Sequence, residues 1–276
     1  MINRFLSEKV THWQASLFIT GVVIILFSPY LFRNPAPLIY PVSELGTDLE
    51  REILPTVQTV VDGIKESGTL PLWATYHLSG RTLVGHPIAP LFYPPNWLLL
   101  ALPLELGLNW LLVLHFAWMG VGFYFFLTKG LGKPVLVSLI VALLFVFTPK
   151  WIAHVSGGHW WMIAALAWWP WVLYAYHRWE KDHRFTWILL VTFALSAQFL
   201  CHIPIFLTCI ITLFIITFLS FDYSFLKLNI GKLITFWVLV GLLCLCITAV
   251  HWMPTIELEP YIYRADNGST FTSLPP

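Results

Sequence analysis

The sequence predicts an all-α, polytopic membrane protein, because its composition is too apolar for a water-soluble domain and its apolar residues fall in long segments. Of the 276 residues, 58% are hydrophobic and 11% are charged, less than half of the ~25% charge typical of soluble proteins. The mean hydropathy is +0.76. One soluble core could not bury this much apolar surface, and a formal net charge of +1 argues against nucleic-acid binding. The expected solvent is therefore a lipid bilayer.

Seven segments approach the ~20 apolar residues with which a helix crosses a membrane, and charges, prolines or glycines separate them. They are 15–32, 108–127, 134–152, 160–176, 185–201, 203–221 and 233–250. The first segment lacks a small-residue cleavage pattern, so we interpret it as an uncleaved anchor. We expect a single transmembrane domain over 1–276, with a first outer loop at 33–95, a transmembrane bundle at 96–252 and an outer tail at 253–276.

An eighth apolar stretch, 88–104, contains four prolines, and the basic residues predict that it does not cross the membrane. If it does not cross, nine of the 15 Lys and Arg residues lie on the side of the N-terminus: Arg4, Lys9, Lys129, Lys133, Arg178, Lys181, Arg184, Lys227 and Lys232. Cytoplasmic segments carry such an excess. We therefore expect a re-entrant or interfacial element at 88–104, a cytoplasmic N-terminus and any chemistry on the outer face.

The first outer loop contains the pattern of an amphipathic helix. Its apolar residues recur at helical spacing, namely Leu49, Ile53, Val57, Val60, Val61 and Ile64. The charged residues Asp62 and Lys65 fall on other faces, which is typical of a helix along the membrane surface. Pro55 is expected to kink or restart this helix, and Gly68 follows its expected end.

Four carboxylates follow the first segment: Glu44, Asp48, Glu50 and Glu52. A carboxylate here can act as general base on a hydroxyl, or it can hold a divalent cation that binds phosphate oxygens. The alternative, which the spacing leaves open, is a solvated acidic loop that caps the following helix.

Other polar and aromatic residues expected on the outer side have two interpretations each. The histidines are His77, His86, His154, His159, His202 and His251; they are either phosphate or metal ligands or ordinary interfacial residues, and none has metal-ligand spacing. Arg81, Lys150 and Arg264 can pair with a lipid-linked phosphate or simply contact headgroups. Trp73 and Trp97 can stack on a sugar or belong to an aromatic belt. The four cysteines lie in apolar segments and are interpreted as small hydrophobic residues.

Consecutive sequence blocks carry a resemblance to a known family. They are Thr47–Leu49, Leu54–Pro55, Ile64–Trp73, Gly80–Leu83, Phe92–Leu98, Gly158–His159, Ala165–Pro170, Gln198, His202–Pro204 and Trp252–Leu258. Their order resembles the bacterial YfhO-type membrane proteins, which are related to the GT-C class of polytopic glycosyltransferases.

The resemblance implies transfer of a sugar, with inversion, from a polyprenyl-phosphate donor to a cell-envelope glycan, lipid or protein, on the outer face of the bacterial inner membrane. Asp48 stands at the place of the family's acidic residue and is the expected base, with Glu44 as a second catalytic candidate. The expected ligands of the donor phosphate and substrate are Arg81, His86, Lys150, His159, His202 and Trp73, with or without a divalent cation such as Mg²⁺ or Mn²⁺.

Two other functions stay open at this stage. Members of the family are usually longer, so we expect this chain to be an N-terminal portion, and it can instead be a non-catalytic factor that binds lipid carriers or partner proteins during envelope assembly. A transporter would need ionisable residues within several spans, and apart from His115 the segments contain almost none.

Overall fold

The computed structural model describes residues 11–33, 38–39, 46–75, 80–86, 91–219 and 223–258, which are mostly helical. The longer helices are α2 (His12–Leu31), α5 (Leu104–Phe125), α6 (Val135–Val146), α9 (Trp169–Asp182), α10 (Phe185–Cys201), α11 (Ile203–Leu219) and α12 (Tyr223–Leu258). The shorter elements are η1 (Leu49–Ile53), α3 (Leu54–Ser67), η2 (Pro94–Trp97), α4 (Leu98–Ala101), η3 (Phe126–Gly130), α7 (Pro149–Ser156) and α8 (Trp160–Leu166). Two short strands, β1 (Trp73–Ala74) and β2 (Arg81–Thr82), form an antiparallel pair.

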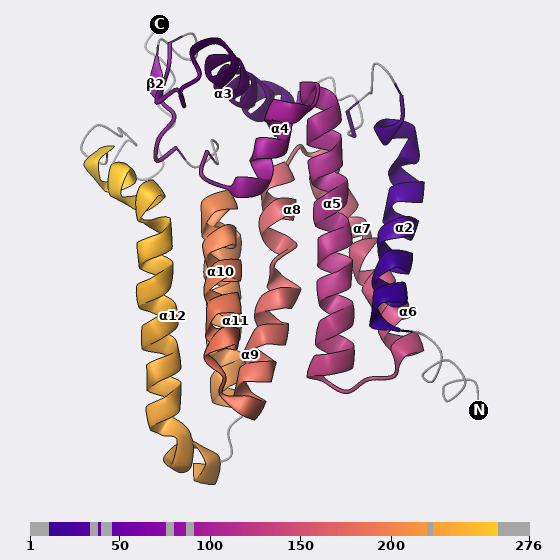
Figure 1. Cartoon of the computed structure of the whole chain (residues 1–276), viewed down its shortest axis with the longest axis vertical. Helices are drawn as coiled ribbons and strands as arrows, with labels where there is room; N and C mark the ends of the chain where they lie inside the picture. Colours follow the sequence, from indigo (N-terminus) through magenta and orange to yellow (C-terminus); the bar gives the residue numbers. More distant parts are fainter. Residues whose placement is uncertain are drawn as a thin grey trace, which may run out of the picture.

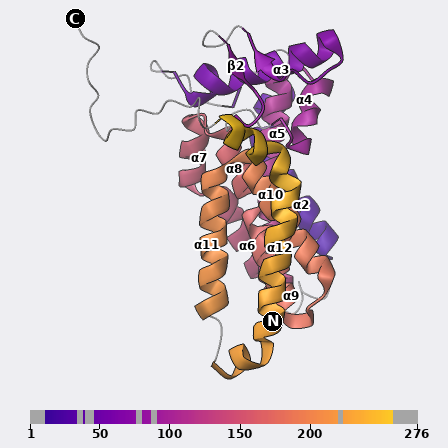
Figure 2. The ribbon, with the colours of Figure 1, turned by 90° about the vertical axis from the view of Figure 1, so that its left-hand side faces the viewer.

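Two helices organise the bundle. α5 packs against α2, α6, α8 and α9, and α10 packs against α8, α9, α11 and α12. These helices stand side by side, and η1, α3, the β1–β2 pair, η2 and α4 gather across one end (Figure 1). We call these gathered elements the cap. A view turned by 90° shows the cap over the same end of the bundle (Figure 2).

Four helical stretches within the described ranges are long and apolar enough to cross a membrane. They are His12–Leu31, Leu104–Gly130, Val135–Ser156 and Ile230–Leu258. Large apolar side chains point away from the bundle, for example Phe18 and Ile25 on α2 and Leu242 on α12. Such surfaces are unfavourable in water and suited to lipid. The prediction of a mostly helical membrane protein is confirmed at this level.

Several expected helix bounds are wrong, and prolines explain two of the differences. The segment 134–152 is interrupted at Phe147–Thr148 before α7 begins with Pro149. The segment 160–176 is divided into α8 and α9, and Pro170 lies in the first turn of α9. Proline is favoured there because a first-turn residue needs no N–H donor for the helix. The expected segments 108–127 and 233–250 are too short, because α5 and α12 continue into more polar residues.

The cap forms largely as its sequence predicts. Pro55 lies in the first turn of α3, so it restarts the helix after the π-helical turn η1, and Gly68 ends α3 in the left-handed conformation at φ +69°. Val57 and Val61 are buried on the inner face of α3. The described part of 88–104 forms η2 and α4 within the cap (Figure 1).

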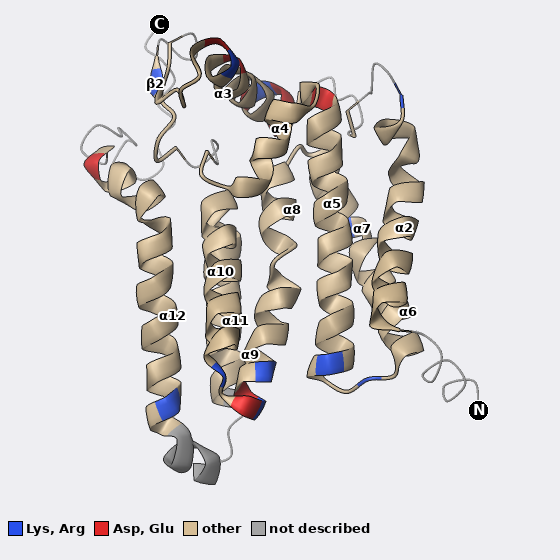
Figure 3. Cartoon of the chain, viewed as in Figure 1, with Lys and Arg blue, Asp and Glu red and all other residues tan. Residues whose placement is uncertain are grey.

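Charges separate along the long axis of the bundle (Figure 3). Acidic residues lie in η1 and α3, in the first turn of α5 at Glu105 and near the end of α12 at Glu257. The opposite end holds basic residues such as Lys129 in η3 and Arg184 at the start of α10, together with two carboxylates of α9. The end that the cap covers holds most of the described carboxylates, together with Arg51, Lys65 and Arg81, and we call it the acidic end. The opposite end is mainly basic.

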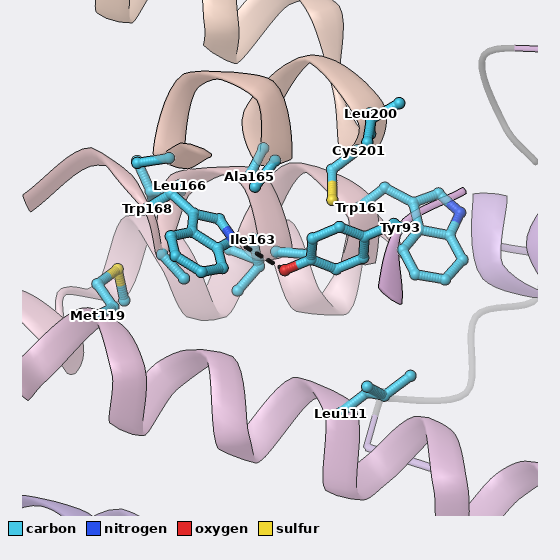
Figure 4. Close-up of a cluster of buried hydrophobic side chains, with 14 of the residues drawn as sticks. Tyr93, Leu111, Met119, Trp161, Ile163, Ala165, Leu166, Trp168, Leu200 and Cys201 are labelled. Carbon is cyan, nitrogen blue, oxygen red and sulfur yellow. Dashed lines mark hydrogen bonds between the residues drawn. The ribbon is translucent and has the colours of Figure 1, made fainter. Parts of the chain in front are cut away.

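Buried hydrogen bonds tie the cap to the bundle, and Figure 4 shows the one between Trp168 and Tyr93. The hydroxyl of Tyr93 accepts a hydrogen bond from Nε1 of Trp168 at 2.8 Å and lies 2.6 Å from Nε2 of His115. Nδ1 of His115 lies 2.6 Å from the carbonyl oxygen of Leu111, which can only accept, so Nδ1 carries the hydrogen. Nε2 of neutral His115 therefore accepts from Tyr93. These contacts fix the loop before η2 against α5 and the junction of α8 and α9.

Replacing Tyr93 by Phe should destabilise the protein by about 1–3 kcal/mol, because Nε2 of His115 loses its partner in a buried position. Tyr93 is 1% exposed and His115 is 7% exposed, so water cannot replace the hydroxyl without repacking. Thermal unfolding in detergent measures the effect. A midpoint equal to that of the wild type would show that the network contributes nothing to stability.

Candidate functional site

A cavity of about 450 Å³ lies at the acidic end, between the cap and the bundle. Residues from η1, from α7 and α8 with the turn between them, and from the end of α10 line it: Asp48, Glu52, Ile53, His154, Gly158, His159, Trp161, Met162, Cys201 and His202. The structure therefore brings three of the predicted site residues together, namely Asp48, His159 and His202. They come from separate parts of the chain.

The residues around Asp48 fix the turn that presents its carboxylate. The backbone N–H of Thr47 donates to the carboxylate of Glu50 at 3.0 Å, and the backbone N–H of Glu50 donates to the hydroxyl of Thr47 at 3.4 Å. This reciprocal pair is a capping box. Asp48 makes no capping hydrogen bond with its side chain. Glu50 is therefore the carboxylate of the acidic cluster that caps the following helix. The carboxylate of Asp48 takes no part in capping and lines the cavity.

Close backbone contact seats η1 against the α7–α8 turn. The backbone N–H of Asp48 donates to the carbonyl oxygen of Gly157 at 3.4 Å. The next residue, Gly158, has φ +82°, and a Cβ atom there would lie 3.0 Å from the backbone nitrogen of Asp48 and closer still to that of Leu49. A side chain at Gly158 would therefore separate the turn from η1.

His159 contacts Asp48, and His154 in turn contacts His159. Nε2 of His159 lies 3.3 Å from Oδ2 of Asp48, and Nδ1 of His159 is hydrogen bonded to Nδ1 of His154 at 2.9 Å. The sequence places His154 among the histidines expected on the outer side but does not select it as a site residue. The two glycines between His154 and His159 were the available signal, because they allow a tight turn that brings both rings together.

His202 completes the histidine side of the cavity, at the junction of α10 and α11. Its Nδ1 accepts a hydrogen bond from the backbone N–H of Ile205 at 3.3 Å, so it caps the start of α11. Burial of the ring lowers the pKa of His202, and the nearby His159 and His154 lower it further. The imidazole of His202 is therefore neutral at pH 7.

Acidification should destabilise the protein through His202. A folded-state pKa below the unfolded value of ~6.5 means that the unfolded chain binds the proton more tightly. This contribution to the free energy of unfolding is fully present at pH values above the pKa of His202 in the unfolded chain, ~6.5. It is lost as the pH falls from there toward the lower pKa of His202 in the folded protein. Thermal unfolding of wild type and His202→Gln across this range checks the expectation. The variant should lose less stability on acidification, and equal slopes would contradict the assignment.

Arg81 of β2 contacts η1 and α3, two other elements of the cap. Its Nη1 donates to the carboxylate of Glu52 at 3.1 Å, and its Nη2 donates to the hydroxyl of Thr56. The side chain of Arg81 is 12% exposed, and Arg81 does not line the cavity among its described residues. Glu52 lies in the same turn as Asp48. The guanidinium of Arg81 therefore holds this turn in place, and its positive charge stays near the cavity.

Replacing Arg81 by Lys should cost about 1–3 kcal/mol of stability, since one ammonium cannot bind Glu52 and Thr56 in the geometry of the guanidinium fork. A double-mutant cycle with Glu52→Gln separates the contribution of the ion pair from the loss of packing. Additive losses in thermal unfolding would show that the two side chains are not coupled.

The remaining predicted residues lie apart from the cavity lining that the structure describes. Trp73 pairs with Thr82 in the strands, and its ring lies against Gly80. His86 follows a turn whose Gly85 carbonyl accepts a hydrogen bond from Thr255 of α12 at 3.0 Å. Lys150 lies on α7, one turn before His154, with its ammonium 5.5 Å from the ring centre of Trp151. Glu44, His77 and Arg264 lie outside the described residues.

No cluster of three His, Cys, Asp or Glu side chains suited to a metal ion occurs among the residues that the structure describes. The expected cation therefore has no preformed ligand set in this part of the chain.

A second cavity, of about 400 Å³, lies under the inner face of α3. Its walls come from α3, the following loop, η2 and α4, and they are almost entirely apolar: Thr56, Val57, Val60, Val61, Ile64, Leu70, Leu91, Phe92, Asn96, Trp97, Leu99 and Leu100. Thr56, which contacts Arg81, belongs to this lining. Thr56 thus connects the apolar cavity with the Arg81–Glu52 ion pair, whose carboxylate lines the polar cavity.

No family model matches this chain, and no curated protein or solved structure is significantly similar to it.

Proposed function

We propose that this chain is a GT-C-type membrane glycosyltransferase of the YfhO-like kind, which moves a sugar from a polyprenyl-phosphate donor to a cell-envelope acceptor with inversion. The observation that carries the proposal is the position of Asp48. Its carboxylate is free of capping bonds and lines a cavity of about 450 Å³ together with three histidines. A carboxylate in such a cavity can take the proton of a hydroxyl that attacks an anomeric carbon.

The neighbouring apolar cavity supports a lipid-linked donor. It is almost free of polar lining groups and lies under an amphipathic helix of the cap. An isoprenoid chain would bury its methylene and methyl groups there, with a gain of ~0.8 kcal/mol for each buried CH₂. His159 and His202 line the polar cavity, and Lys150 lies one turn before His154 on α7; these three side chains are the proposed ligands of the donor phosphate. Arg81 links the two cavities, because it bonds Glu52 of the polar lining and Thr56 of the apolar lining.

The proposed membrane orientation places this site outside a bacterial inner membrane. Successive helical runs alternate in direction along the bundle (Figure 1). We take α2, α5 with η3, α6 with α7, α8 with α9, α10, α11 and α12 as separate passes, so the proposed topology has seven crossings. The positive-inside rule then assigns the mainly basic end to the cytoplasm and the cap, with both cavities, to the outer face.

Mass spectrometry of envelope glycans and glycolipids tests the proposal. A deletion strain should lack a sugar that reappears when the full chain is supplied, and the mass difference identifies the sugar class. An unchanged set of glycans in the deletion strain, together with no transfer by the purified chain, would overturn the proposal.

The apolar cavity also favours a second candidate, a non-catalytic factor that binds lipid carriers. In that case Asp48→Asn should fully restore the deletion phenotype, because lipid binding in the apolar cavity does not need the carboxylate.

A further inference from the structure

Three titratable side chains form a row along the cavity. The carboxylate of Asp48 contacts Nε2 of His159 at 3.3 Å, and Nδ1 of His159 is hydrogen bonded to Nδ1 of His154 at 2.9 Å. Both ring nitrogens of His159 are thus occupied, one by each neighbour. An imidazole that is contacted on both nitrogens can accept a proton on one side while it releases a proton on the other.

The protonation state of Asp48 sets the direction of the row. An ionised carboxylate can only accept, so Nε2 of His159 carries the hydrogen in the resting state. Nδ1 of neutral His159 then accepts from Nδ1 of His154, and Nε2 of His154 carries no hydrogen. Once Asp48 is protonated, its hydrogen can pass on only after both imidazoles exchange tautomers, so that His159 carries its hydrogen on Nδ1 and His154 on Nε2. In that arrangement Asp48 donates to Nε2 of His159, His159 donates to Nδ1 of His154, and Nε2 of His154 holds the outermost hydrogen.

We propose that His159 and His154 carry away the proton that Asp48 takes from the acceptor hydroxyl. This inference rests on the proposed glycosyl transfer. During transfer the acceptor oxygen bonds to the anomeric carbon, and the bond from that carbon to the donor phosphate breaks with its electron pair going to the phosphate oxygen. The hydrogen of the hydroxyl passes to Asp48. One hydrogen then leaves Nε2 of His154 for water while the others shift along the row, and Asp48 returns to its carboxylate.

The exposure of the three groups explains why a relay is useful. The side chains of Asp48 and His159 are 65% and 42% exposed when the cavity is open. A donor and an acceptor that fill about 450 Å³ cover Asp48 and exclude water from it. His154 lies at the far end of the row on α7, where it is part-exposed and also lines the cavity. The row therefore moves the proton two side chains away from the reacting hydroxyl.

Steady-state transfer by the purified full chain tests the relay, with a polyprenyl-phosphate sugar as donor. His159→Phe and His154→Phe should each lower kcat about tenfold or more, whereas KM for the acceptor stays close to that of the wild type. The double variant should be no slower than the slower single variant, because both residues act in one chain. Added imidazole should restore part of the rate of His154→Gly. His177→Gln, which changes a histidine of α9 at the opposite end, is the matched control and should keep the wild-type rate.

The outcomes separate the relay from the function on which it rests. If the wild type transfers no sugar, the proposed function fails. If the wild type is active and Asp48→Asn is inactive but His159→Phe keeps the wild-type kcat, the relay is wrong and the function stands. A raised KM without imidazole rescue would make the histidines substrate ligands and would also overturn the relay. If a Phe variant unfolds, the corresponding Gln variant, which cannot pass a proton, replaces it.

Discussion

Asp48→Asn should lower sugar transfer by about 10²–10⁴-fold, the usual contribution of a positioned general base. The amide of Asn has nearly the size of the carboxylate, but it cannot take the acceptor's proton. Stability should change by less than ~0.5 kcal/mol, as is typical of exposed positions, because the side chain is 65% exposed and makes no capping bond. Transfer measured on the purified chain, with thermal unfolding as the companion measurement, gives both numbers.

Asp62→Asn is the matched control for this substitution. Asp62 is an acidic residue of the same cap and accepts a hydrogen bond from the amide of Gln58 at 2.6 Å on the exposed face of α3, outside the described cavity lining. An Asn side chain still accepts this bond, so transfer should stay at the wild-type level. Equal losses in the two variants would indicate a general effect of negative charge near the membrane surface. Full activity of Asp48→Asn would exclude this carboxylate as the base.

Composition and periodicity predict the fold class, and they do so because the bilayer imposes a simple constraint. Apolar runs such as 185–201 and 203–221 correspond closely to α10 and α11, since a chain in lipid must satisfy its backbone within a helix. The breaks before α7 and α9 are harder to predict. Pro149 and Pro170 lie within apolar runs, and hydropathy does not register the hydrogen bonds that a proline removes.

The sequence predicts the site only in part, because residues far apart in the chain make its contacts. The family resemblance singled out Asp48 within the acidic cluster, but only the folded chain shows that Glu50 forms the capping box and that Asp48 makes no capping bond. Arg81 was expected to bind phosphate, and its pairing with Glu52 depends on how β2 packs beside η1. Contacts of this kind arise from tertiary packing, which no local pattern encodes.

The close approach of two backbones at Gly158 is the least visible of these contacts in the sequence, and it gives the last prediction. Gly132→Ala provides its matched control, because Gly132 also has a positive φ, +67°, and a Cβ atom there would meet no atom within 4 Å. That variant should lose only the ~1–2 kcal/mol of the left-handed conformation. Gly158→Ala has the same backbone cost, and in addition its Cβ would press on the backbone nitrogens of Asp48 and Leu49.

Gly158→Ala should therefore be clearly less stable than Gly132→Ala in thermal unfolding. It should also lower transfer by about 10²-fold, since a shift of ~1 Å in a catalytic group has effects of that size. Gly132→Ala should keep full activity, because the loop that precedes α6 is remote from the cavity (Figure 1). Equal stability of the two variants would mean that η1 moves aside at no cost. The rate of sugar transfer by Gly158→Ala would then show whether Asp48 acts from a fixed position. A fully active variant would contradict the proposal that the α7–α8 turn holds the base in place.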